Sequence, residues 1–170
     1  MRRSLLLVLA VTFCTSTAFG QKQREVMVVH PDVVVKNRSG DKVPVGLGDV
    51  LTVTSEKDGF LWVPRLNGWA PKEDTLDVKD AVQLFSATIK EKPSAQAWHH
   101  RAKAWYALGR YQKAIDDFDQ AIAIARTKRL SDRSDDKDRM VSLQINRANA
   151  YRELGKADRA IQGYTSALSL

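Results

Sequence analysis

The second half of the chain repeats itself, and this repeat restricts the fold more than any other feature of the sequence. A set of alanine, aromatic and glycine positions recurs at an offset of 46 residues. The earlier copy is Ala102, Trp105, Gly109, Ala114, Ile115, Phe118 and Ala121, and the later copy is Ala148, Tyr151, Gly155, Ala160, Ile161, Tyr164 and Ala167. A shorter copy lies 33 residues upstream and comprises Ala81, Val82, Phe85 and Thr88. Equal spacing at so many positions predicts a structural unit that is used repeatedly.

Each copy has the pattern of two helices that pack side by side. From Val78 onward, apolar residues follow a period of about 3.6, which is typical of amphipathic helices. This period predicts helices over residues 78–92, 95–108, 111–126, 137–154 and 157–170. Pro93 ends the first of them, and Gly109 and Gly155 each provide a tight turn within a pair. Small alanines allow antiparallel helices to approach closely, and the aromatic residues fill the space between pairs.

The repeated residues resemble the tetratricopeptide repeat, a helix–turn–helix unit of about 34 residues. Trp98 and Gly109 stand at the tryptophan and glycine positions of that unit, whereas Arg126 replaces its proline and Gln144 replaces the tryptophan in the second copy. The resemblance implies an α–α helical solenoid of about two and a half repeats. Its parts are a half repeat over 78–93, a repeat over 95–126, an inserted loop over 127–137 and a repeat over 138–170.

Residues 21–77 have a different pattern, with short valine-rich alternations between turn residues. These alternations predict strands over 26–29, 33–36, 50–53, 60–63 and 68–71. Asp58-Gly59 and Asn67-Gly68 are strong hairpin signals, because these residue types tolerate the positive φ of a tight turn. Short strands at this density predict a small β-barrel, which closes on itself and so hides its strand edges.

This segment resembles a bacterial Src-homology-3 (SH3)-like domain. The residues that carry the resemblance are the runs 48–53, 59–63 and 68–71, with Leu76 closing the barrel. The acidic, tyrosine-rich loop with which eukaryotic relatives bind proline-rich peptides is missing, so that activity is not implied. The expected fold is therefore multi-domain, all-β plus all-α: an SH3-like barrel over 21–77, followed by helical repeats over 78–170.

The first 20 residues have the layout of a secretory signal peptide. Arg2 and Arg3 precede an apolar run, and Ala18-Phe19-Gly20 supplies small residues before a cleavage site. The apolar run is shorter than the roughly 20 residues of a transmembrane helix, so no anchor is expected after cleavage. The expected location is exported, either periplasmic or secreted. Cys14 lies in this segment and is the single cysteine of the chain, so we expect neither disulfides nor thiolate metal sites in the mature protein.

The net charge of the chain is +7, from 27 lysine and arginine residues against 20 aspartate and glutamate residues. Residues 78–170 contain 17 basic and 11 acidic side chains, so the positive excess lies in the helical repeats. Nucleic acid is not the expected partner, because no basic run is longer than residues 126–129 and the protein is expected to be exported. An acidic protein, a peptide or a cell-envelope polymer suits this charge better.

No pattern in the sequence indicates catalysis, a cofactor or a metal site, and the chain is not expected to be an enzyme. His99 and His100 are about 100° apart on a helix, so they are poorly placed to hold one metal ion. Their helical neighbours at 102–104 supply no further ligand. The two histidines are interpreted either as groove-lining contacts or as exposed helix surface. The acidic residues at 135, 136 and 138 are interpreted as a helix start rather than a calcium loop.

The resemblance to tetratricopeptide repeats implies that the concave face of the helices holds the ligand. The groove candidates are Gln96, His99, His100, Lys103, Tyr106, Ile145, Asn146, Asn149 and Arg152. Their mixture of amide, imidazole and cationic groups suits an acidic or extended peptide, with Lys103 and Arg152 contributing the charge. On the barrel, the aromatic residues Phe60, Trp62 and Trp69 have two open interpretations, as core residues or as the rim of a ligand groove.

The last predicted helix has no capping helix after it in the sequence, although repeat arrays normally end in one. Ile161, Tyr164 and Leu168 are therefore interface candidates, for a homodimer or for docking of another protein; the alternative is a tolerated apolar patch. Taken together, the sequence predicts a non-enzymatic, exported adaptor that acts through protein–protein contact. The alternative is a cell-wall or glycan-binding protein that uses its barrel as the reader.

Overall fold

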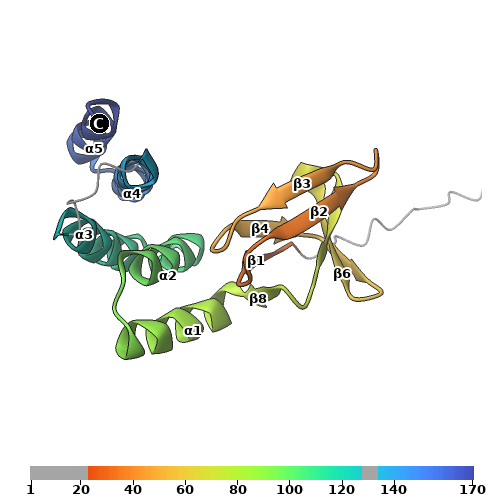
Figure 1. Cartoon of the computed structure of the whole chain (residues 1–170). Coiled ribbons are helices and arrows are strands. Elements are labelled where there is room, and N and C mark those ends of the chain that lie inside the picture. Colours follow the sequence, from red (N-terminus) through yellow and green to blue (C-terminus); the bar gives the residue numbers. More distant parts are fainter. Residues whose placement is uncertain (1–22, 128–133) are drawn as a thin grey trace, which may run out of the picture.

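The computed structural model describes residues 23–127 and 134–170, and the expected signal peptide over 1–20 lies outside them. A β-rich part and a stack of helices lie side by side, joined at α1 (Figure 1). Within the described ranges, none of the helices combines the length and the apolar character that crossing a membrane requires.

The β-rich part contains two antiparallel sheets. One sheet has the order β4 (Val50–Val53), β1 (Arg24–Val28) and β8 (Thr75–Asp77). The other has the order β3 (Lys42–Val45), β2 (Val33–Asn37), β7 (Gly68–Pro71), β6 (Phe60–Val63) and β5 (Ser55–Lys57). The two sheets are connected through β4 and β5, because these strands are separated only by Thr54, where the chain changes from one sheet to the other.

The structure confirms the five predicted strands and adds three that the sequence analysis missed, namely β3, β5 and β8. The expectation of a single sheet closing on itself is not confirmed, because the described strands form two hydrogen-bonded sheets. The reason is the change of partner at Thr54: β4 pairs with β1, whereas β5 pairs with β6. Both sheets nevertheless enclose one apolar core, which includes Val26, Val35, Leu51, Val53, Leu61, Val63 and Ala70.

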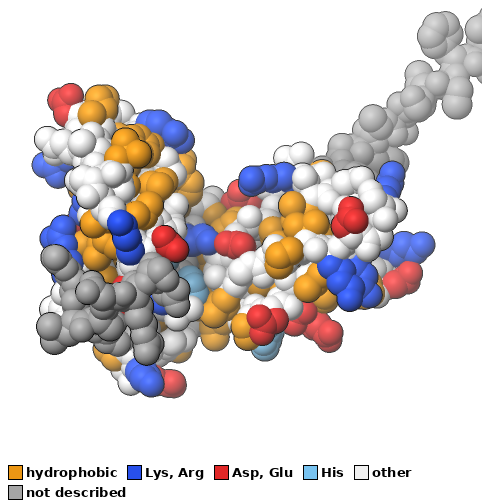
Figure 2. Space-filling view, turned by 45° about the horizontal axis from the view of Figure 1, so that its top comes forward, with side chains coloured by type: hydrophobic (Ala, Val, Ile, Leu, Met, Phe, Trp, Pro, Cys, Tyr) orange, Lys and Arg blue, Asp and Glu red, His pale blue; other side chains and the backbone are white. Residues whose placement is uncertain are grey.

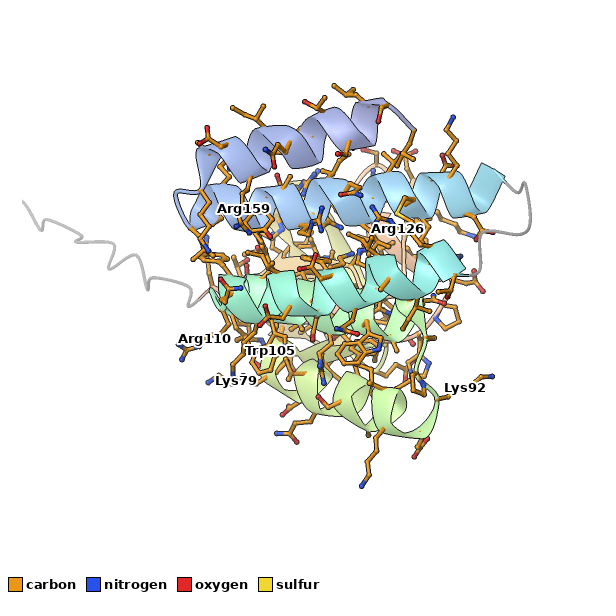
Figure 3. All side chains as sticks on the ribbon, turned by 90° about the vertical axis from the view of Figure 1, so that its left-hand side faces the viewer. Lys79, Lys92, Trp105, Arg110, Arg126 and Arg159 are labelled. Carbon is orange, nitrogen blue, oxygen red and sulfur yellow. The ribbon has the colours of Figure 1, made fainter. Side chains whose placement is uncertain are left out.

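The helical part consists of α1 (Val78–Glu91), α2 (Ala95–Ala107), α3 (Tyr111–Thr127), α4 (Ser134–Glu153) and α5 (Ala157–Leu168). Figure 3 shows them stacked in this order from α1 to α5, with α2 behind α3. Asp77 caps α1 through its side chain, and Ser94 caps α2 in the same way. Gly109 and Gly155 both have positive φ at the turns within the pairs, as expected.

One predicted boundary differs. The inserted loop was expected over 127–137, but α4 already begins at Ser134, so part of the expected loop is helical. Asp136 lies in the first turn, where a carboxylate is favoured by the helix dipole, and it pairs with Arg139 at 3.1 Å. Residues 128–133 lie outside the described residues.

The β-rich part packs directly on the first two helices. Met27 of β1 is fully buried in a cluster with Val82 and Phe85 of α1 and Ala104 of α2. Trp105 of α2 packs both in this cluster and in the cluster around Phe118, and in Figure 3 it lies between α1 and α3. Because β8 ends at Asp77 and α1 begins at Val78, the chain passes from one part to the other without a linker. The two parts are therefore held in one arrangement by packing and by the chain itself.

Candidate functional site

A large recess lies between the β-rich part and the helices. It is a cleft of about 730 Å³, bounded by β3, β4 and the 3₁₀ turn η1 (Pro64–Leu66) on one side and by α2, α3 and α4 on the other. Figure 2 shows the two parts as separate lobes with a hollow between them. One side of the cleft is the concave helical face, which the sequence analysis predicted as a binding surface. The other side is the edge of a strand, which the sequence analysis did not predict.

An ion pair spans the base of this cleft. The Lys103 Nζ donates to Asp49 Oδ1 at 2.9 Å, which connects α2 to the start of β4. Burial raises the pKa of Asp49, but the hydrogen bond and charge of Lys103, together with the Gly46 N–H, outweigh burial and lower this pKa overall. Lys103 was predicted to provide positive charge for an acidic ligand. In the structure its charge is already matched by a carboxylate.

Three of the predicted groove residues line the helical wall of the cleft, and Lys103 joins them. Tyr106 comes from α2, whereas Asn146 and Asn149 lie on α4 one helical turn apart. The Tyr164 hydroxyl donates to Asn149 Oδ1 at 2.7 Å, and this bond leaves the amide nitrogen of Asn149 without a partner among the described residues. These side chains present phenol and amide groups, which suit hydrogen bonding to a peptide backbone.

Neither of the two histidines is fully exposed on the helix surface. His100 is only 6% exposed, and its ring lies against Gly48 and edge-on to Phe85 at 5.1 Å. The expectation that His100 lines the groove or faces solvent is therefore wrong, because the β-rich part covers this face of α2. His99 is half-buried, and its Nε2 lies 3.0 Å from Asn146 Nδ2.

Both histidines have pKa values well below the usual range. Burial, aided by the charge of Lys103, lowers the pKa of His99 to about 3 and that of His100 to about 4. The neutral ring is thus the stable form of each in the folded protein. Within the described ranges, no group of three or more histidine, cysteine or acidic side chains is placed to hold a metal ion.

The remaining groove candidates lie outside the cleft lining. Gln96 is exposed in the first turn of α2, and Ile145 is 39% exposed on α4. Arg152 is exposed near the end of α4 and pairs with Glu153 at 2.9 Å. The structure therefore brings together Lys103, Tyr106, Asn146 and Asn149 but not the full predicted set.

A second recess, of about 640 Å³, lies on the outer face of the β-rich part. Phe60 and Trp69 line it, and the ring of Trp62 lies 5.1 Å from that of Trp69. Arg38 stacks over Trp62 at 4.9 Å. Phe60 is 43% exposed and lines this recess together with the half-buried Trp69, which fits the rim of a groove for these two residues. Trp62 is half-buried and lies outside the lining.

The interface candidates on α5 separate into two groups. Ile161 is 62% exposed and Leu168 is 89% exposed, whereas Tyr164 turns inward to Asn149. On α3, Ile115 and Ile122 hold the equivalent positions of the preceding repeat, and both are buried in clusters that include side chains of α4. Ile161 and Leu168 thus occupy positions that a following helix would cover.

Sequence analysis missed several residues that shape the site. Gly48 and Asp49 contact α2, which no local pattern indicates, because the contact depends on how the two parts pack. Asp117 is only 5% exposed, and the sequence analysis did not predict this burial. It accepts two hydrogen bonds from Arg101, at 2.7 and 2.8 Å, which tie α2 to α3. Its helical position on the side of Ala114 and Phe118 was the available signal.

Comparison with protein families matches the helical part alone. The tetratricopeptide repeat family matches residues 95–128 and again residues 141–170. The first match begins with α2 and runs through α3, and the second covers most of α4 and all of α5. No curated protein matches the chain. These two segments are tetratricopeptide repeats, a class of helical repeat that typically forms protein–protein interaction modules.

Proposed function

We propose that this protein is an exported, non-catalytic adaptor that binds an extended peptide segment of a partner protein in the cleft between its repeats and its β-rich part. One observation carries the proposal: the concave face of the repeats, with Tyr106 and Asn149, lines a recess whose other wall is a strand. Helical repeats of this class usually offer only helices to a ligand. Here the ligand meets hydrogen-bonding side chains on one side and a β-strand on the other.

The cleft lining favours a peptide of low charge. Glu25 and Asp49 contribute two carboxylates, and Arg65 and Lys103 contribute two cations. Because these charges balance, the lining gives little support to the acidic partner that the composition indicates. The excess positive charge lies on other surfaces of the helices, so an acidic partner would have to use those.

Affinity for peptides selected from a random displayed library tests this proposal. The full chain is immobilised, binding peptides are selected, and the dissociation constants of the synthetic peptides are measured by calorimetry. We expect Asn149→Ala to weaken binding about tenfold, because a side-chain amide in the cleft is lost. Tyr164→Phe is the matched control, since it removes the same internal hydrogen bond but leaves Asn149 in place.

Two results would contradict the proposal. In the first, selection yields no peptide that binds the folded chain. In the second, the selected peptides bind both variants as tightly as they bind the parent protein. Equal weakening by both variants would assign the effect to the lost internal bond and also count against a role of the amide. Thermal unfolding of each variant provides the check that folding is retained.

A glycan-binding function is the second candidate, and it is favoured by the outer face of the β-rich part. Phe60 is exposed, and Trp62 and Trp69 are half-buried with their rings 5.1 Å apart. Two lysines and two carboxylates share the recess that Phe60 and Trp69 line, namely Lys36, Lys57, Asp58 and Glu73. Aromatic faces beside a balanced set of charged groups suit the sugar rings of a polysaccharide. We expect Trp69→Ala to reduce co-sedimentation with insoluble cell wall if this function operates, whereas Asn149→Ala leaves it unchanged.

Export rests on the pattern of residues 2–20, namely a basic start, an apolar run and small residues before Gln21. We expect the protein isolated from cells that export it to begin at Gln21. Mass measurement of the intact mature chain checks this, and retention of Met1 or Arg2 would contradict it.

We also propose that the exposed face of α5 associates with a helix of a second copy. The support is the equivalence of Ile161 and Leu168 to Ile115 and Ile122, which lie beneath α4 in the preceding repeat. A helix with the apolar pattern of α4 is therefore the kind of surface that this face fits.

A further inference from the structure

Strand β4 has one edge in the cleft that is paired with none of the described strands. In the ladder between β1 and β4, Val26 lies opposite Leu51 and Glu25 opposite Thr52. The Val28 N–H donates to the Asp49 carbonyl at 2.9 Å, which fixes the alternation of bonded and non-bonded pairs. Leu51 therefore bonds to β1. The N–H and C=O groups of Val50 and Thr52 point the other way, into the cleft.

The chain itself explains why this edge is open. Farther along, the Thr54 N–H donates to the Trp62 carbonyl at 3.2 Å, so β6 follows the same side of the strand up to that point. Pro64 then begins the 3₁₀ turn η1 and has no N–H to donate. Because the chain turns away there, β6 does not reach Thr52. Among the described residues, the only strand pairing of Thr52 is with β1, and no turn or loop hydrogen bond reaches its other side.

The cleft around this edge has two chemically different walls. Val43, Val45 and Leu66 of the β-rich part form an apolar wall, whereas Asn146 and Asn149 belong to the helical wall. Successive side chains of a strand point to opposite faces. A strand lying beside β4 would therefore direct alternate side chains toward the apolar wall and toward the amides.

Charge complementarity also limits the occupant. The four charged side chains in the lining, Glu25, Asp49, Arg65 and Lys103, sum to zero, and the Lys103 charge is matched at 2.9 Å by Asp49. Neither an anionic nor a cationic ligand is attracted by such a lining. Besides the Asn149 amide nitrogen, the backbone donors and acceptors of Val50 and Thr52 in the described lining are open, and an extended, uncharged peptide backbone has the matching set.

We propose that the partner peptide binds by strand addition: it pairs with the open edge of β4 at Val50 and Thr52, extends the sheet of β4, β1 and β8, and carries alternating apolar and polar side chains. This inference rests on the proposed peptide-binding function and specifies its mode. Hydrogen bonds to the peptide backbone provide affinity that does not depend on the peptide sequence. Contacts of the two walls with alternate side chains provide the sequence specificity.

Proline substitution at the edge tests the proposal with the selected peptides described above. Thr52→Pro removes the N–H that points into the cleft without removing a bond to β1, and proline is tolerated at such edge positions. We expect at least a tenfold loss of affinity. Lys42→Pro is the matched control, because the Asn37 N–H bond to the Asp41 carbonyl places the Lys42 N–H on the outer edge of β3, outside the cleft lining.

A second measurement uses the unchanged protein, so that it remains decisive if Thr52→Pro fails to fold. Peptides with single N-methyl groups are titrated against the parent chain. Strand addition predicts strong loss of affinity at alternate peptide positions and little loss between them, because alternate backbone N–H groups face β4.

The outcomes separate the inference from the function on which it rests. If Asn149→Ala weakens binding but Thr52→Pro and every N-methylated peptide bind like their parents, the cleft binds peptide without strand addition and the inference falls alone. If no peptide is selected, or neither variant matters, the proposed function falls and the inference with it. A dimer that Thr52→Pro dissociates would assign the edge to a second copy and overturn the proposal.

Discussion

The ion pair between Arg101 and Asp117 shows how a single residue fastens the repeats together. Asp117 is almost fully buried on α3 and receives both hydrogen bonds from one guanidinium of α2. The same guanidinium donates to Ser86 of α1 at 3.1 Å and stacks over Trp98 at 4.7 Å. One side chain thus holds three consecutive helices, which explains why a charge is tolerated at this depth.

Removing the Asp117 carboxylate should therefore lower the stability of the protein strongly. We expect Asp117→Ala to lower the free energy of unfolding by about 3 kcal/mol, because it leaves a largely buried guanidinium without its partner. The neighbouring Asp116→Ala should cost only about 0.3 kcal/mol, since that exposed side chain makes a single bond with Gln112 on the same helix. Urea unfolding of both variants measures the difference, and equal stabilities would contradict the structural role of the pair.

The two histidines make stability depend on pH. Their folded pKa values, about 3 and about 4, lie below the ordinary value of 6.5, so the unfolded chain binds protons first as the pH falls. Stability should be constant with respect to these groups above pH 6.5. It should then decrease by about 1–2 kcal/mol per histidine between pH 6.5 and 5. Urea unfolding at several pH values measures this slope, and the double variant His99→Gln, His100→Gln should lose most of it.

The sequence predicted the position of individual residues correctly only where a repeat or a turn determined that position. The glycines at 109 and 155 have the expected positive φ. His100 was misplaced, because its burial depends on Gly48, which lies 52 positions away in the chain. Lys103 was placed in the cleft, but its partner Asp49 was not foreseen, since nothing local connects a β-turn with the second helix.

At the scale of elements, periodicity was a reliable guide. The five helices begin within three residues of their predicted starts, because glycine, proline and serine define their ends. The strands that the sequence missed are short or polar: β5 is Ser-Glu-Lys, and β3 contains Pro44. Such strands lack the alternation on which prediction depends, and they form because neighbouring strands pair with them.

Helix α5 provides the prediction at this scale. We expect the double variant Ile161→Gln, Leu168→Gln to abolish self-association, because it makes polar the two positions that a following helix would cover. Stability should change little, since both side chains are exposed by more than half. Sedimentation across a wide concentration range measures the effect, with the exposed Gln162→Ser as the control. A parent protein that is monomeric at every concentration would contradict the proposed association.

At the scale of the whole molecule, the packing of the β-rich part against α2 determines the shape of the cleft. Gly48 has a φ of +80°, and a methyl group there would lie 2.4 Å from the His100 ring. Gly59 has the same φ of +80° but nothing within 4 Å. The two positions therefore share the backbone requirement and differ only in the contact with the helices.

Alanine variants at Gly48 and Gly59 separate the cost of backbone strain from the cost of losing the contact between the β-rich part and α2. We expect Gly59→Ala to cost about 1–2 kcal/mol, from the left-handed backbone alone. Gly48→Ala should cost about 1–3 kcal/mol more, because it also forces the β-rich part away from His100. Thermal unfolding compares the two variants, and amide exchange at α2 should increase only in Gly48→Ala. Equal destabilisation would show that the contact contributes little.

The direct passage from Asp77 to Val78 limits how far the two parts of the molecule can move apart. A barrel on a flexible linker would release its ligand by swinging aside, but here any tilt has to unwind the first turn of α1 and break its Asp77 cap. The width of the cleft is consequently the same with and without a ligand, so a ligand that binds there costs the protein little conformational entropy.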